Sequence, residues 1–108
     1  MSRVLLEACV DSVESALAAQ AGGADRVELC ENLLEGGTTP SAGMLEVCHE
    51  RLRIPTHVLV RPRGGDFVYS EVEIEVMQRD IALARRLGAK AVVFGALHPD
   101  GTIHVEQV

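Results

Sequence analysis

The residues whose side chains are best suited to bind a metal ion are two cysteines that come at the ends of two predicted strands. Cys9 closes the run from Arg3, and Cys30 closes the run from Arg26. Adjacent strands lie about 4.8 Å apart, so thiols at the same end and on the same face can approach each other. Two thiolates suit Cu(I), which accepts low coordination by sulfur, whereas structural zinc normally requires four ligands. The alternative is that both cysteines are small buried core residues.

The remaining cysteine and the histidines have structural interpretations. Cys48 falls on the apolar stripe of a predicted helix, so we expect a core residue rather than a ligand. His57 begins its strand at the end opposite the cysteines and is expected to be structural. His49, His98 and His104 fall on a helix surface and in terminal loops, where solvated histidines are ordinary.

Four charged residues support a catalytic alternative. Glu7 and Glu28, on the two cysteine-bearing strands, have the chemistry of a general acid and base. Arg61 and Arg63, followed by the glycines of Gly64-Gly65-Asp66, offer two guanidinium forks to a carboxylate or a phosphate. Such a site would act on a small anionic or sugar-like substrate. The structural alternative is that the arginines form internal ion pairs with Glu7 or Glu28.

The segments that carry these residues alternate between strand and helix. Asp11 or Ser12 is expected to cap the first helix, and Pro40 is placed in the first turn of the second. Ser70 and Glu73 form a capping box for the third. Strands recurring at intervals of roughly 25 to 30 residues with helices between them are parallel and joined by right-handed crossovers. The predicted strands are Arg3–Cys9, Arg26–Cys30, Thr56–Val60 and Ala91–Phe94.

The two faces of the predicted sheet differ in polarity. Because side chains alternate along a strand, one face is wholly apolar and suited to helices; it comprises Val4, Leu6, Val27, Leu29, Val58, Val60, Val92 and Phe94. The opposite face is polar and comprises Glu7, Cys9, Glu28, Cys30, His57 and Arg61. An open sheet with helices on both faces would bury these charges at a cost of several kcal/mol. A barrel with a polar mouth accommodates them better.

The sequence therefore predicts an α/β fold, specifically a TIM-type (β/α)8 barrel. Such a barrel usually takes about 250 residues and eight strands, whereas this chain has 108 residues and supplies about the first four βα units. Residues 1–108 are expected to form a single domain, the N-terminal half of the barrel.

Composition narrows the choice of partners and compartment. Ten Lys and Arg against 16 Asp and Glu give a net charge of -6, which disfavours nucleic acid and anionic membranes. The first apolar run is interrupted by Glu7 and is too short for a signal peptide or a spanning helix. We therefore expect a cytoplasmic protein, in which all three cysteines are free thiols.

Five motifs in this order resemble those of the CutC-type copper homeostasis proteins. They are Glu7-Ala-Cys-Val-Asp-Ser, Gly23-Ala-Asp-Arg-Val-Glu-Leu-Cys, Glu35-Gly-Gly-Thr-Thr-Pro-Ser, Arg61-Pro-Arg-Gly-Gly-Asp-Phe and Val92-Val-Phe-Gly. The resemblance implies a cytosolic TIM-type barrel that binds copper, with Cys9 and Cys30 matching the two cysteines proposed as Cu(I) ligands. It implies no established enzymatic activity. Lys90-Ala, where the family commonly has Asp-Gly, and His104, where an Asp is common, depart from the pattern.

A sheet of four parallel strands leaves two edges unpaired, and exposed edges invite further pairing. Either further chain was lost or left out, so that this polypeptide is a fragment or a truncated gene product, or two copies assemble so that each fourth strand meets the other copy's first strand. The second alternative makes the protein a homo-oligomer.

Overall fold

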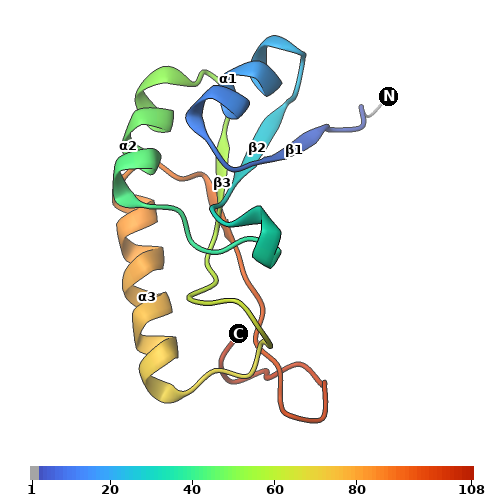
Figure 1. The fold of residues 1–108 in the computed structure, drawn as a ribbon, viewed down its shortest axis with the longest axis vertical. Coiled ribbons are helices and arrows are strands. Elements are labelled where there is room, and N and C mark those ends of the chain that lie inside the picture. Colours follow the sequence, from blue (N-terminus) through green and yellow to red (C-terminus); the bar gives the residue numbers. More distant parts are fainter. Residues whose placement is uncertain (1–2) are drawn as a thin grey trace.

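The computed structural model describes residues 3–108 and contains one parallel sheet. The elements in chain order are β1 (Glu7–Val10), α1 (Val13–Ala21), β2 (Arg26–Leu29), the short 3-10 helix η1 (Leu33–Glu35), α2 (Ala42–Arg51), β3 (Thr56–Leu59), α3 (Glu71–Arg86) and β4 (Ala91–Val93). The strands pair in the order β1-β2-β3-β4, and every pair is parallel. The predicted alternation of strand and helix is confirmed (Figure 1).

Serine side chains begin all three α-helices. Ser12 accepts a hydrogen bond from the Ser15 backbone N–H and caps α1. Ser41 caps α2, so Pro40 lies ahead of the cap and not in the first turn as predicted. Ser70 and Glu73 form the expected capping box of α3. Each cap satisfies a backbone donor that the helix leaves free, which fixes where the helix begins.

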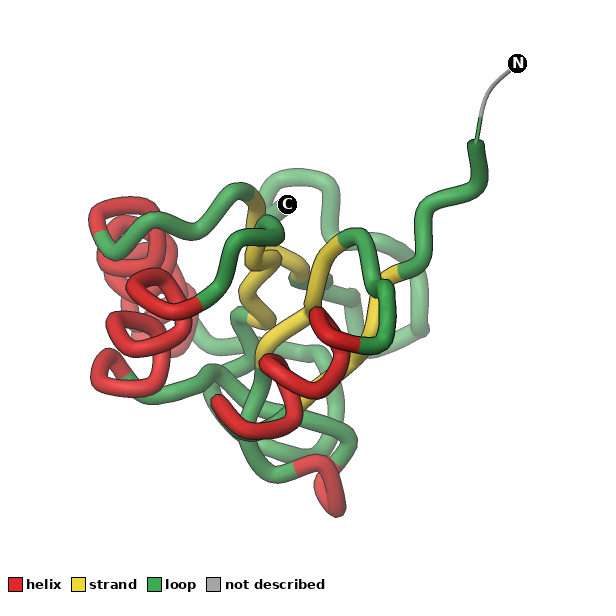
Figure 2. Tube along the Cα trace, turned by 90° about the horizontal axis from the view of Figure 1, so that it is seen from above, coloured by secondary structure: helices red, strands yellow, loops and turns green. Residues whose placement is uncertain are grey.

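The helices pack along one side of the curved sheet, here called the outer face (Figure 2). The main core joins this face to the helices; its buried members are Val10, Ala16, Val27, Leu29, Leu45, Cys48, Val58 and Ala84. A second buried cluster, at the carboxyl end of β3 and the start of α3, contains Val60, Tyr69, Met77 and Ala96. The opposite side of the sheet, here called the inner face, is polar on β1 and β2 but partly apolar on β3 and β4. Its members within the strands are Glu7, Cys9, Arg26, Glu28, His57, Leu59, Ala91 and Val93.

The first strand is shorter than predicted. It begins at Glu7, and Val4 and Leu6, which were expected on the apolar outer face, are 91% and 59% exposed. The reason is that β1 pairs only with β2, whose first residue, Arg26, stands opposite Glu7. The residues before Glu7 therefore have no ladder to join. Within residues 3–108, β1 and β4 each keep one edge without a strand partner.

No helix in the described part of the chain combines the length and the apolar character needed to cross a membrane.

Candidate functional site

Cys9 and Cys30 share the inner face, at the carboxyl ends of β1 and β2. Cys9 stands opposite Glu28 in the register, and Cys30 follows Glu28 by two residues on the same side. Cys9 is exposed, whereas Cys30 is 1% exposed. The backbone of Gly37 packs over Cys30, since a Cβ built there would lie 3.4 Å from the Cys30 Sγ. The pair therefore consists of one accessible thiol and one covered thiol.

The environment of Cys30 favours its protonated form. Burial raises the pKa of the Cys30 thiol to about 12, and the neighbouring Cys9, Glu28 and Asp11 act in the same direction. The Cys30 Sγ lies 3.6 Å from the carbonyl oxygen of Val10, to which it donates. A thiolate is the form that binds metals, so an ion entering here has to displace a proton from Cys30.

The donor set fits a soft ion of low coordination number. Residues 3–108 contain no group of three or more His, Cys, Asp or Glu side chains arranged to hold a metal ion. A four-ligand zinc centre thus has no counterpart in the described chain, whereas two sulfurs satisfy the low coordination that Cu(I) accepts.

Glu7 and Glu28 also lie on the inner face, on adjacent strands. The Oε2 atom of Glu7 is 2.6 Å from the Nε of Arg26 and 3.5 Å from the Nδ1 of His57. Burial and the charge of Glu7 raise the pKa of the Glu28 carboxyl, while His57 opposes them. Glu7 is thus paired with Arg26 and lies beside His57, and Glu28 sits where its charged form is disfavoured.

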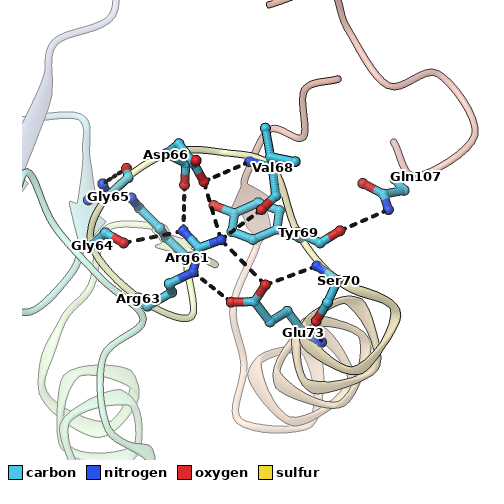
Figure 3. Close-up of polar contacts among 10 residues, drawn as sticks. All are labelled: Arg61, Arg63, Gly64, Gly65, Asp66, Val68, Tyr69, Ser70, Glu73 and Gln107. Atoms are coloured by element: carbon cyan, nitrogen blue, oxygen red, sulfur yellow. Dashed lines mark hydrogen bonds and ion pairs between the residues drawn. The ribbon is translucent and has the colours of Figure 1, made fainter. Parts of the chain in front are cut away.

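The guanidinium group of Arg61 donates hydrogen bonds to the loops around it; Figure 3 shows the one to Gly65. Its guanidinium Nη1 donates to the carbonyl oxygens of Glu35 (2.7 Å) and Gly37 (2.8 Å), and its Nη2 donates to that of Gly65 (2.8 Å). The Phe67 ring lies 5.1 Å from the guanidinium carbon. Only the Nε atom is buried without a hydrogen-bond partner. Arg61 therefore ties the loop after β2 to the loop after β3.

Arg63 is held by its own loop and by Glu73 of α3 (Figure 3). Its Nε lies 2.6 Å from the Oε2 of Glu73, and other guanidinium nitrogens donate to the carbonyl oxygens of Asp66 and Val68, each at 2.7 Å. Neither arginine forms the predicted ion pairs with Glu7 or Glu28; the carboxylate partners of Arg63 are Glu73 and Asp66. An anion held between Arg61 and Arg63 stays a prediction, and it would have to compete with these contacts.

Sequence reasoning missed Arg26 as a member of the inner face, and it gave His57, which it placed on that face, only a structural part. Arg26 was not considered. It lies two residues before Glu28 in the same strand, so its side chain points to the same face as those of Glu28 and Glu7. His57 was expected to be structural; it stands opposite Glu28 in the register and within 3.5 Å of Glu7. Cys48 is fully buried in the core, as predicted.

The parallel βα units and the polar carboxyl-terminal edge define the class of protein: an α/β chain of the TIM-barrel type. The CutC family model matches residues 4–108, and the chain belongs to the CutC family. The crystal structure of CutC from Streptococcus agalactiae has a TM-score of 0.91 and 37% identity to this chain, over 97% of this chain and 51% of that one. The predicted fold class is confirmed, with this chain matching about half of that structure.

Two curated relatives carry the family name at higher identity. The copper homeostasis protein cutC homolog of Homo sapiens is 61% identical over 102 residues, which are 94% of this chain and 37% of that protein. The family protein CutC of Mesorhizobium japonicum is 56% identical over 99 residues, 92% of this chain and 38% of that protein. The chain thus spans less than half the length of these relatives.

Proposed function

We propose that this chain takes part in copper homeostasis by binding one Cu(I) ion between the thiolates of Cys9 and Cys30. The proposal rests on one observation: both thiols lie on the inner face at the carboxyl ends of adjacent strands, where Cys30 follows the register partner of Cys9 by two residues. This edge is where barrels of this type place their binding sites. The ion itself would supply no covalent chemistry, so the protein acts by holding it.

The asymmetry of the pair supports reversible loading. The exposed Cys9 is the first sulfur that an incoming ion meets, and the covered Cys30 completes the two-coordinate site after losing its proton. The name of the human relative refers to copper homeostasis, which agrees with this chemistry. Copper handling by thiols further requires a reducing compartment, and we propose the cytoplasm.

Anaerobic titration of the reduced protein with Cu(I), in competition with a chromogenic chelator, tests the proposal. We expect about one ion per chain and a loss of affinity of at least about tenfold for Cys9→Ser or Cys30→Ser, because each removes one of two soft ligands. Cys48→Ala is the matched control: it removes a cysteine from the core and should retain the ion. Unchanged affinity in both serine variants would refute the proposal.

A second candidate function is catalysis on a small anionic or sugar-like substrate, with Glu7 and Glu28 as base and acid. The observation that favours it is the geometry of the carboxylates, which lie on adjacent strands of the inner face with Glu7 anchored by Arg26 and His57. The double variant Cys9→Ser/Cys30→Ser separates the two functions. It abolishes copper binding, whereas a catalytic site built on the carboxylates would lose little.

A further inference from the structure

Half of the cationic side chains in this acidic chain gather at the end of the sheet opposite the cysteines. Arg51 ends α2, Arg85 and Arg86 end α3, and Arg53 and Lys90 lie on the connections that lead into β3 and β4. The ends of these two helices and the starts of these two strands lie toward the upper part of the molecule in Figure 1. We call this end the base of the sheet.

None of the five basic side chains at the base forms an ion pair or a side-chain hydrogen bond within residues 3–108. Among the chain's other arginines, Arg3, Arg26, Arg63 and Arg79 pair with carboxylates, and Arg61 is bonded to backbone carbonyls. The unpaired cations of a chain with a net charge of -6 are therefore confined to one place.

Helix electrostatics accounts for only part of this cluster. Arg51, Arg85 and Arg86 stand in the last turns of their helices, where a positive charge interacts favourably with the helix dipole. Arg53 and Lys90 lie beyond the helices, so this effect does not explain them. The position of these two residues calls for a different reason.

Arg53 and Lys90 line the same hollow. It has a volume of about 280 Å³, and its wall is formed by Cys48, His49, Leu52, Arg53, Ile54, Pro55, Thr56, Gly88 and Lys90. No carboxylate contributes to this wall. The His49 ring lies directly against the backbone of Gly88, which has a φ of +95°, and a Cβ at that glycine would collide with the ring. The absent side chain of Gly88 leaves the imidazole at the wall of the hollow.

We propose that this hollow binds a small phosphate-bearing molecule, with the phosphate between Arg53 and Lys90. Two cations that have no carboxylate partner in the described chain are available to an oxyanion, and His49 and Thr56 add polar groups beside them. Leu52, Ile54 and Pro55 form an apolar wall suited to a short organic portion. The site lies at the opposite ends of the strands from Cys9 and Cys30, so it is independent of copper binding.

Titration of the full 108-residue chain, labelled with nitrogen-15, with inorganic phosphate tests the site by NMR. Ionic strength is held constant with sodium chloride, so that general screening does not change during the titration. We expect saturable shifts of the backbone amides at residues 53–56 and 88–90. Phenyl phosphate should bind at least about threefold more tightly than inorganic phosphate, because its ring reaches the apolar wall. Shifts spread over the surface, or equal affinities for the two probes, would overturn the proposal.

A pair of double variants separates a site from general attraction. Arg53→Ala/Lys90→Ala should weaken phosphate binding by at least about fivefold, since it removes both direct charge contacts. Arg51→Ala/Arg86→Ala removes the same charge from the same end of the sheet, outside the wall of the hollow, and should change the affinity by less than about twofold. Equal losses in the two variants, or no loss in the first, would show that the hollow does not bind phosphate. Circular dichroism of each variant confirms that the fold is retained.

Discussion

The two faces of the four-stranded sheet differ in what their side chains contact. On the outer face, Val27, Leu29 and Val58 are each 0% exposed and pack against the helices. On the inner face, β1 and β2 carry charged or polar side chains and β3 carries His57, while Leu59, Ala91 and Val93 make the rest of that face apolar. Glu7 and His57 are only partly buried. The outer face carries the apolar contacts that stabilise the fold, and the inner face carries groups whose burial costs free energy.

This difference between the faces predicts whether a substitution changes stability or binding. A residue and its neighbour in the same strand experience opposite environments, because successive side chains point to opposite faces. Substitution on the outer face should act mainly on stability. Substitution on the inner face should act mainly on the binding of ions or ligands, except where an inner residue is tied into the loops.

The largest effect is expected for Leu29→Ala on the outer face. Leu29 is fully buried in β2, a central strand, and its truncation leaves a cavity. We expect the free energy of unfolding to fall by about 3 kcal/mol, as measured by urea denaturation. Leu34→Ala is the matched control, because the same side chain is truncated at a position on η1 that is 106% exposed; its effect should stay below about 0.5 kcal/mol. If both variants lose similar free energy of unfolding, the burial of the outer face is not the main source of stability.

A smaller effect is expected for Arg61→Met, just after the carboxyl end of β3. The change keeps much of the side-chain volume and leaves the carbonyl oxygens of Glu35, Gly37 and Gly65 without their donor. We expect a loss of about 2 kcal/mol in the free energy of unfolding, with faster amide hydrogen exchange in residues 33–39. Arg79→Met, which breaks only an exposed pair with Glu75, should cost less than about 0.5 kcal/mol. If residues 33–39 keep their protection, Arg61 does not hold that loop.

Sequence alternation predicted the two faces because it needs only the pleat of a strand. It placed Leu29 and Val58 in the core and brought Cys9 and Cys30 to the same edge. It was wrong for Val4 and Leu6, because the length of an edge strand depends on its neighbour, and β2 starts only at Arg26. The same alternation places Arg26 and Glu7 on one face at the starts of adjacent strands, so the contact between them could have been predicted.

The contacts of Arg61 and Arg63 could not have been predicted in the same way. The acceptors of Arg61 come from Glu35, Gly37 and Gly65, which lie in two irregular loops without a fixed side-chain period. Their positions depend on the path of each loop, including the left-handed backbone at Gly37 and Gly65. The identity of the copper ligands stays a prediction, because alternation gives the proximity of two thiols and not the ion that they bind.

The smallest effect is expected for Glu28→Gln, the inner-face neighbour of Leu29 in the same strand. Burial and the charge of Glu7 raise the pKa of Glu28 in the folded chain. A raised carboxyl pKa means that the folded state holds the proton more tightly than the unfolded state, whose pKa is about 4.3. The free energy of unfolding therefore falls as the pH rises from about 4.3 through the raised pKa, and this loss persists at neutral pH.

Glutamine keeps the shape of the side chain and does not titrate, so Glu28→Gln should abolish that loss. At pH 7 we expect the metal-free, reduced variant to be more stable than the parent chain by up to about 1 kcal/mol, and at pH 4 we expect the advantage to vanish. Urea denaturation of both proteins across this range measures the difference, in which other titrating groups largely cancel. A variant less stable than the parent at pH 7 would mean that the attraction of His57, which opposes the shift, outweighs burial. The inner face would then stabilise the fold through its charges, and the contrast with the outer face would be one of mechanism alone.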